Sequence, residues 1–185
     1  MRTTPRTLAG MRVALGLLAA SLLPASTALA DVTATTPAQA KKLCLGIPAS
    51  ATKSLYKGKV RGPLPGTGGA TCQFEPAGTG VPHGTLFVQL AVGSGTLWAQ
   101  YSPGANRVSG IGSKAAYTWS QASASAPGLV AEKGDLDCYV TTNGYIANTT
   151  IAYRMSGGTA VVSQAGAAAW ARKLGAVCNA VFRGK

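Results

Sequence analysis

The sequence has 185 residues, with 17 Lys and Arg against five Asp and Glu, so its formal net charge at pH 7 is +12. So few acids argue against catalysis by a pair of carboxylates. The positive charge favours anionic partners such as envelope polymers, acidic lipids, nucleic acid or acidic proteins. The same charge also improves solubility, so a purely solubilising role stays open.

The first thirty residues predict a cleavable secretory signal peptide. Three arginines and no acid precede an almost unbroken apolar run over residues 13–23, and Ala28-Leu29-Ala30 supplies a small-residue cleavage site. The apolar run is about half of the roughly 20 residues that a membrane-spanning helix needs. We therefore expect a secreted or envelope-located protein, with a single mature domain over residues 31–185 and no transmembrane segment after cleavage.

The mature part contains four cysteines, and an even number in an exported chain predicts two disulfides. No C-x-x-C pair of the kind that binds zinc is present, so no metal site is predicted, and no cofactor either. Three pairings are possible. We favour Cys44–Cys72 with Cys138–Cys178, because these would tie each terminal helix to a strand.

Two short helices are predicted near the start of the mature domain. Thr36 is a helix cap, Pro37 suits the first helical position, and Gln39 completes a capping box, so a helix is expected to about Leu45. A second short helix is expected from Pro48 to about Tyr56. Residues 57–69 are rich in Gly and Pro and predict a loop.

A series of strands is predicted next. Residues 86–92 alternate between a wholly apolar face and a mixed face that carries Phe87, Gln89 and Ala91, as in a largely buried strand. Asn143-Gly144 is a strong hairpin signal because both residues tolerate positive φ. The predicted strands are residues 71–75, 86–92, 114–119, 129–133, 135–142 and 145–153.

A long final helix is expected to begin after Ser163, which can cap it. Its apolar residues form one stripe at helical spacing: Ala167, Trp170, Leu174, Val177, Cys178 and Val181. The order of elements predicts an α+β fold, in which an antiparallel sheet is covered by the long C-terminal helix and one or two short N-terminal helices.

The chain contains the motifs Leu43-Cys44, Cys72-Gln73-Phe74, Gly110-Ile111-Gly112-Ser113-Lys114-Ala115, Cys138-Tyr139-Val140 and Val177-Cys178. In these motifs and in the order of its elements it resembles a family of actinobacterial exported proteins and lipoproteins of unknown function, and it is similar in outline to the extracellular sensor domain of a mycobacterial serine/threonine kinase. Ser113 stands where the family usually has Asp, and the lipid-attachment Cys is missing. The resemblance implies an extracytoplasmic binding or sensor-like domain and transfers no catalytic residue.

The densest basic cluster comprises Lys53, Lys57, Lys59 and Arg61, with Tyr56 among them. These residues are the candidate ligand-binding site: an anion-binding patch with one aromatic platform. The alternative is a flexible, solvated loop. The sequence has no nucleic-acid-binding motif, and an exported protein seldom meets nucleic acid as its main partner, so no nucleic-acid partner is expected.

Catalysis is a weaker hypothesis. Ser50-x-x-Lys53 and Ser54-x-x-Lys57 match the S-x-x-K pattern of serine acyl enzymes, but S-D-N and K-T-G partners are missing. Such an enzyme would need a buried Lys beside an accessible Ser. His83 is the only histidine, and no G-x-S-x-G motif accompanies it. We predict no catalytic residue.

The sequence therefore favours a non-enzymatic binding or sensor-like domain for an anionic envelope component or a protein partner. An inhibitor of an exported enzyme is the alternative, with Arg61 in its Gly/Pro-rich segment as the candidate contact. The acidic residues point to no further candidate site, although Asp135 and Asp137 are expected to share a strand face. The oligomeric state is left open.

Overall fold

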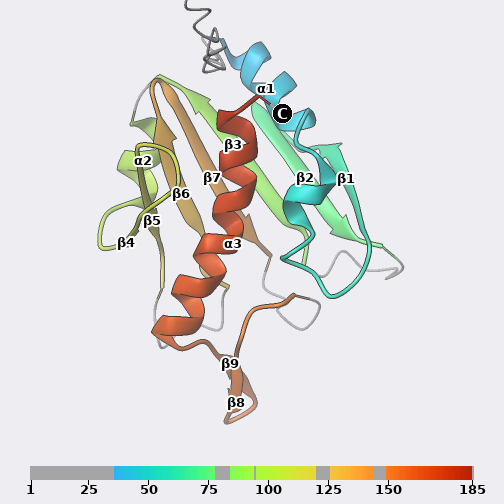
Figure 1. Cartoon of the computed structure of the whole chain (residues 1–185), viewed down its shortest axis with the longest axis vertical. Helices are drawn as coiled ribbons and strands as arrows, with labels where there is room; N and C mark the ends of the chain where they lie inside the picture. Colours follow the sequence, from blue (N-terminus) through green and yellow to red (C-terminus); the bar gives the residue numbers. More distant parts are fainter. Residues whose placement is uncertain (1–35, 78–83, 94, 120–125, 144–148, 185) are drawn as a thin grey trace, which may run out of the picture. The chain divides into compact units, whose positions relative to one another are not determined.

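The computed structural model describes residues 36–77, 84–93, 95–119, 126–143 and 149–184, all within one compact unit, Asp31–Lys185. Within it a seven-stranded antiparallel sheet packs against a long helix, which confirms the predicted α+β class (Figure 1). No helix in the described ranges is long and apolar enough to cross a membrane. The helices are α1 (Pro37–Leu45), the 3₁₀ helix η1 (Ala49–Thr52), α2 (Thr96–Tyr101) and α3 (Gln164–Phe182), and the strands are β1 (Val60–Pro65), β2 (Ala70–Pro76), β3 (Leu86–Val92), β4 (Asn106–Val108), β5 (Lys114–Tyr117), β6 (Leu129–Lys133), β7 (Leu136–Thr142), β8 (Arg154–Ser156) and β9 (Thr159–Val161).

Strand β7 lies at the centre of the sheet, whose order is β1-β2-β3-β7-β6-β5-β4. Two three-stranded antiparallel units, β1–β3 and β4–β6, are joined only because β7 pairs with both of them. Cys138 faces Leu90 of β3 on one side and Ala131 of β6 on the other. The two halves of the sheet therefore depend on one strand for their relative position.

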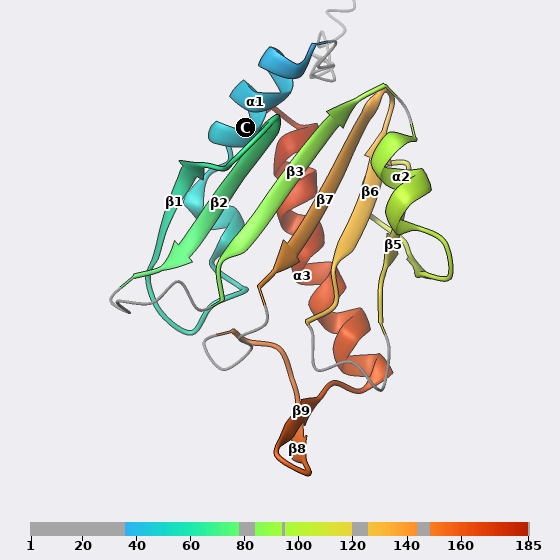
Figure 2. The ribbon, with the colours of Figure 1, turned by 180° about the vertical axis from the view of Figure 1, so that it is seen from behind.

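Helix α3 covers one face of the sheet, which we call the inner face (Figures 1 and 2). Every residue of the predicted apolar stripe of α3 is buried, and Ser163 caps the helix by accepting a hydrogen bond from the Gly166 N–H, as predicted. Trp170 is 1% exposed, and its indole Nε1 donates to the Pro127 carbonyl over 3.1 Å. This bond satisfies the one polar atom that the indole brings into the core.

Two disulfides hold the terminal helices to the sheet. Cys44 of α1 is bonded to Cys72 of β2, and Cys138 of β7 is bonded to Cys178 of α3, which confirms the favoured pairing. The capping box at Thr36 and Gln39 is also present, and α1 ends at Leu45 as expected. The second short helix is shorter than predicted, because the 3₁₀ helix ends at Thr52.

The prediction of a loop over residues 57–69 is wrong for its central part, which forms β1. This strand lies at the edge of the sheet and pairs on one side only. It therefore does not need every N–H group for pairing and tolerates Pro63 and Pro65, which have none. The register shifts between Arg61 and Leu64, around the close approach of Gly62 to the Phe74 backbone. An irregular edge strand thus accommodates a composition that usually indicates a loop.

The prediction of a strand over residues 145–153 is wrong where the structure describes it. Both edges of β7 are already paired, with β3 and β6, so a strand following the Asn143-Gly144 turn has no free edge of β7 to join. The β pairing of residues 149–153 is limited to the isolated bridge Thr149–Tyr56, and residues 144–148 lie outside the described ranges. The hairpin β8–β9 follows instead, joined by Gly157 and Gly158 at positive φ.

The Gly110–Lys114 turn docks onto α3. Ile111 is 4% exposed and packs against Gly175, while the Asn179 side chain accepts from the Gly112 N–H and donates to the Gly110 carbonyl. A Cβ at Gly112 would lie 2.4 Å from the Glu132 carbonyl oxygen, so glycine is required there. The turn is a structural junction between the sheet and the final helix.

Removing either disulfide is expected to lower the free energy of unfolding by about 3–4 kcal/mol. The bridges close loops with sequence separations of 28 and 40, so each restricts the unfolded chain to a similar degree. Urea unfolding of the paired Cys→Ser variants C44S/C72S and C138S/C178S checks this. A loss below about 1 kcal/mol for either pair would contradict it.

Gly175→Ala is expected to destabilise the protein, although Ala is the better helix former. The new Cβ would lie 2.3 Å from Ile111 Cδ1. It would also lie 2.6 Å from Ile111 Cγ1, and Ile111→Ala removes both atoms, so the double variant should lose less stability than the two single variants added together. Unfolding free energies of the four proteins test this coupling, and simple additivity would contradict the proposed contact.

Candidate functional site

The basic segment, defined here as residues 53–61, has a well-anchored backbone. Leu55 is fully buried and Tyr56 is 5% exposed. The Leu55 carbonyl accepts from the Thr150 N–H over 2.9 Å, and the Tyr56 hydroxyl donates to the Gly84 carbonyl over 2.7 Å. The backbone is therefore held by the core, and the Tyr56 ring faces the interior rather than a ligand.

The cations of the basic segment lie on two sides of the sheet. Lys53, Lys57 and Lys59 are exposed around the two buried anchors, and Lys53 directly follows η1, which contacts α3 and β1. Arg61 is 70% exposed and forms an ion pair with Glu75 on β2. Arg61 thus faces the side of the sheet opposite α3, and it belongs to a paired strand rather than to a protruding loop.

Most acids in the described ranges are engaged within the fold. Glu75 pairs with Arg61, and Glu132 pairs with Lys114 over 2.9 Å. Asp137 is fully buried on β7, whereas Asp135 is exposed in the turn before it, so the two do not form a pair of carboxylates on one face. Among the described residues, no group of three His, Cys, Asp or Glu side chains could hold a metal ion.

Asp137 provides the cap of α2. Its carboxylate accepts from the Leu97 N–H over 2.8 Å, from the Trp98 N–H over 3.1 Å and from the Gly95 N–H over 3.4 Å. Gly95, the residue at the cap position, has no side chain for this role. A short helix that was not predicted from sequence is thereby fixed onto the sheet.

The serine-lysine pairs do not have the environment that a serine hydrolase needs. Ser50, Lys53, Ser54 and Lys57 are all exposed, so neither lysine lies in the buried setting that the hypothesis requires. His83 lies outside the described residues.

The face opposite α3, here called the outer face, is covered only in part. Helix α2 packs over β6, β7 and the Ala91 end of β3, and its Leu97 forms one apolar cluster with Ala116 and Val130 (Figure 2). Over β1, β2 and the rest of β3, no element of the described ranges covers this face. The uncovered part carries Thr71, Gln73, Glu75, Phe87 and Gln89.

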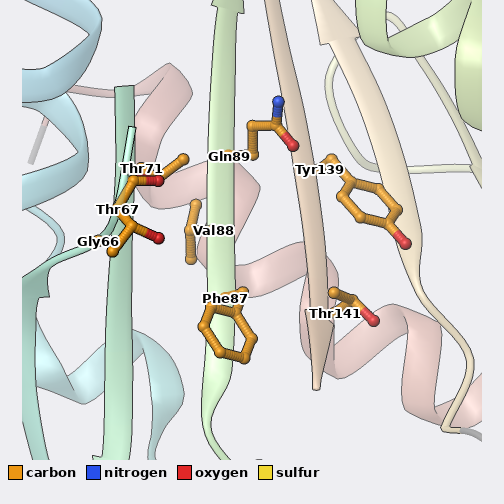
Figure 3. Close-up of a pocket in the computed structure, with 8 residues that line it drawn as sticks. All are labelled: Gly66, Thr67, Thr71, Phe87, Val88, Gln89, Tyr139 and Thr141. Atoms are coloured by element: carbon orange, nitrogen blue, oxygen red, sulfur yellow. The ribbon is translucent and has the colours of Figure 1, made fainter. Parts of the chain in front are cut away.

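A concavity of about 160 Å³ lies on this uncovered part, and we call it the outer-face pocket (Figure 3). It is formed by three adjacent strands and the β1–β2 turn, with side chains that point away from α3. The side chains that concern us are Thr67, Thr71, Phe87, Gln89, Tyr139 and Thr141. They combine two aromatic rings with hydroxyl and amide groups, and none is charged.

Tyr139 is the fixed wall of the outer-face pocket. Its ring stacks on Tyr101 of α2 with centroids 3.8 Å apart and an interplanar angle of 4°. Gly128 lies against it so closely that a Cβ there would be 2.9 Å from the hydroxyl. Burial raises the pKa of Tyr139, partly opposed by a hydrogen bond with Thr141, so the hydroxyl remains a donor at neutral pH.

The outer-face pocket was not predicted from the sequence, although one signal pointed to it. Phe87 and Gln89 lie on the mixed face of β3, and a Phe on that face is the unusual member. In the sequence, Tyr139 stands out only as part of the motif Cys138-Tyr139-Val140. Its role depends on α2, whose cap is Asp137 of the same strand, forty residues from Leu97 in the chain. Comparison with protein-family models, curated proteins and solved structures found no match.

Tyr56→Phe is expected to remove an alkaline dependence of stability. Burial raises the pKa of Tyr56 well above its ordinary 10.0, and a backbone hydrogen bond from Leu86 only partly opposes this. The folded state then keeps the proton longer than the unfolded chain, so this contribution is complete below pH 10.0 and is lost as the pH rises above it. Relative to the variant, the wild type should lose up to about 1.4 kcal/mol per pH unit there.

Urea unfolding of both proteins between about pH 7 and about pH 11 measures this difference. At the lower pH the variant should be less stable by about 1 kcal/mol, because the bond to the Gly84 carbonyl is lost. Parallel stability curves across the whole range would contradict the assignment.

Proposed function

We propose that this protein is an exported, non-enzymatic binding domain for an anionic polymer of the cell envelope. The observation that carries the proposal is the basic segment, whose lysines are exposed while Leu55 and Tyr56 anchor its backbone in the core. A preorganised set of cations loses little conformational freedom when it binds. Two disulfides, which persist in oxidising compartments, support the exported setting.

The distribution of acids also supports an anionic ligand. Glu75 and Glu132 are paired with cations, and the Asp137 carboxylate is buried against α2. The surface therefore offers few acids that could repel a polyanion, whereas residues 31–185 carry 14 Lys and Arg against five acids, a net charge of +9. A repeating polyanion matches this arrangement, since it can place several negative groups along one basic segment.

Neutralising the basic segment is expected to weaken binding to an anionic polymer by at least tenfold. Each exposed lysine near an anionic surface contributes on the order of 1 kcal/mol. The test variant is K53Q/K57Q/K59Q. It spares Arg61, which is already paired with Glu75. The control variant K41Q/R154Q/R172Q removes the same charge at exposed positions elsewhere.

The measurement is co-sedimentation with insoluble cell wall that retains its phosphate-bearing polymers, at about 50 mM and about 500 mM NaCl. The full-length protein is expressed in an exporting host and purified oxidised, and its N-terminus is determined. Binding should fall at high salt and in the test variant more than in the control. Equal binding to wall stripped of phosphate polymers, or equal loss in both variants, would reject the proposal.

A further inference from the structure

The outer-face pocket is placed where a ligand has free access. Helix α2 covers the outer face over β6, β7 and the Ala91 end of β3, and Phe87 is 39% exposed at the other end of β3. A single exposed apolar ring is ordinary on a protein surface. Phe87 differs because it lies in a concavity, with Gln89 two residues along its strand and Thr141 opposite it on β7 (Figure 3).

The pocket is held in shape by the fold rather than formed by the ligand. Tyr139 is fixed between Tyr101 and Gly128, and its strand is paired on both edges. Thr71 hydrogen-bonds the carbonyls of Thr67 and Gly68, which holds the β1–β2 turn at the opposite wall. Preformed walls are typical of small-ligand sites.

The size of the pocket limits what it can hold. Sites for drug-sized ligands measure roughly 300–1,000 Å³, and this cavity measures about 160 Å³. It therefore has room for one small ring or side chain, not for a whole cofactor. A larger ligand would cross the outer face and insert a single unit.

The lining determines the chemistry of that unit. Its hydroxyl and amide groups can both donate and accept hydrogen bonds, and the exposed Phe87 ring offers an apolar face. Because none of the lining side chains is charged, a charged group would enter without a counterion and lose its hydration. The fitting unit is uncharged, rich in hydroxyl groups, and apolar on one side.

An extended peptide fits this surface less well. Peptides commonly bind sheets by adding a strand to an edge, where main-chain groups are free. The nearest edge is β1, in which Pro63 and Pro65 lack N–H groups and the register is irregular. The pocket lies on the face of the strands, where side chains and not main-chain groups make the contacts.

We infer that the outer-face pocket binds one uncharged sugar residue of an envelope polysaccharide. Phe87 lies against the C–H face of the sugar ring, whose polarised hydrogens meet the negative face of the aromatic ring. Gln89, Tyr139 and the threonines exchange hydrogen bonds with its hydroxyl groups. This inference rests on the proposed function, because it names which part of the envelope polymer the domain recognises besides the anionic groups.

The test uses neutral hexasaccharides of glucose, mannose, galactose, arabinose and N-acetylglucosamine with the full-length oxidised protein. Saturation-transfer NMR detects contact, and a titration gives the dissociation constant. At least one hexasaccharide should bind, and Phe87→Ala and Gln89→Ala should each weaken binding about tenfold. Both positions face solvent, and unchanged urea unfolding confirms that the variants are folded.

Two matched controls locate the effect. Gln164→Ala removes the same type of side chain at an exposed position on α3, and Tyr153→Ala removes an aromatic ring that is also 39% exposed. Both controls should bind as the wild type does. Failure of all five sugars to bind, wild-type binding by the Phe87 and Gln89 variants, or equal loss in the controls would each overturn the inference.

The two proposals fail separately. K53Q/K57Q/K59Q should keep its affinity for the neutral hexasaccharide, and that affinity should not depend on salt, because no charge is involved. Loss of salt-sensitive wall binding alone would reject the anionic ligand and leave the sugar site. Loss of sugar binding alone would reject the pocket and leave the basic segment.

Discussion

The structure depends on the double pairing of β7. This strand alone connects the two three-stranded halves of the sheet, and Cys138 at its middle is bonded to Cys178 of α3. In chain order, β7 follows both of the strands between which it lies, and the helix that covers it comes last. Antiparallel pairing on both edges also removes β7 as a site for further strands.

The two faces of β7 have separate tasks. Its inner residues pack beneath α3, while its outer residues fix α2 and line the outer-face pocket. Asp137 caps α2 from the sheet, and Tyr139, stacked on Tyr101 of that helix, becomes a wall of the outer-face pocket. The buried Asp137 carboxylate accepts hydrogen bonds from three N–H groups and thereby fixes α2, the helix that carries Tyr101.

The basic segment and the outer-face pocket are complementary in chemistry. The exposed lysines suit negative groups, and the uncharged pocket suits a hydroxyl-rich ring. Strand β1 connects them, because Arg61 extends the basic segment onto the outer face, where Glu75 pairs with it. Under the two proposals, the charges would supply long-range attraction to an envelope polymer and the pocket would supply selectivity.

Much of the fold could be predicted because local signals were strong. The capping box at Thr36, the apolar stripe of α3 and the alternation in β3 depend on residues that are neighbours in the chain, and all three are present. The favoured disulfide pairing, one of three possible, is the one present. Composition misled where a sheet edge tolerates prolines, as in β1.

The candidate site was less accessible to sequence reasoning. Residues 145–153 carry good strand signals, yet no edge of β7 was left for them, and such competition for an edge is invisible in a local pattern. Similarly, the Asp137 cap lies forty residues from Leu97, and the Tyr101–Tyr139 stack joins a helix to a strand. The sequence by itself determined charge, cysteine number and most elements, because these are local. Only tertiary structure decided which side chains meet on the outer face, because that depends on long-range pairing.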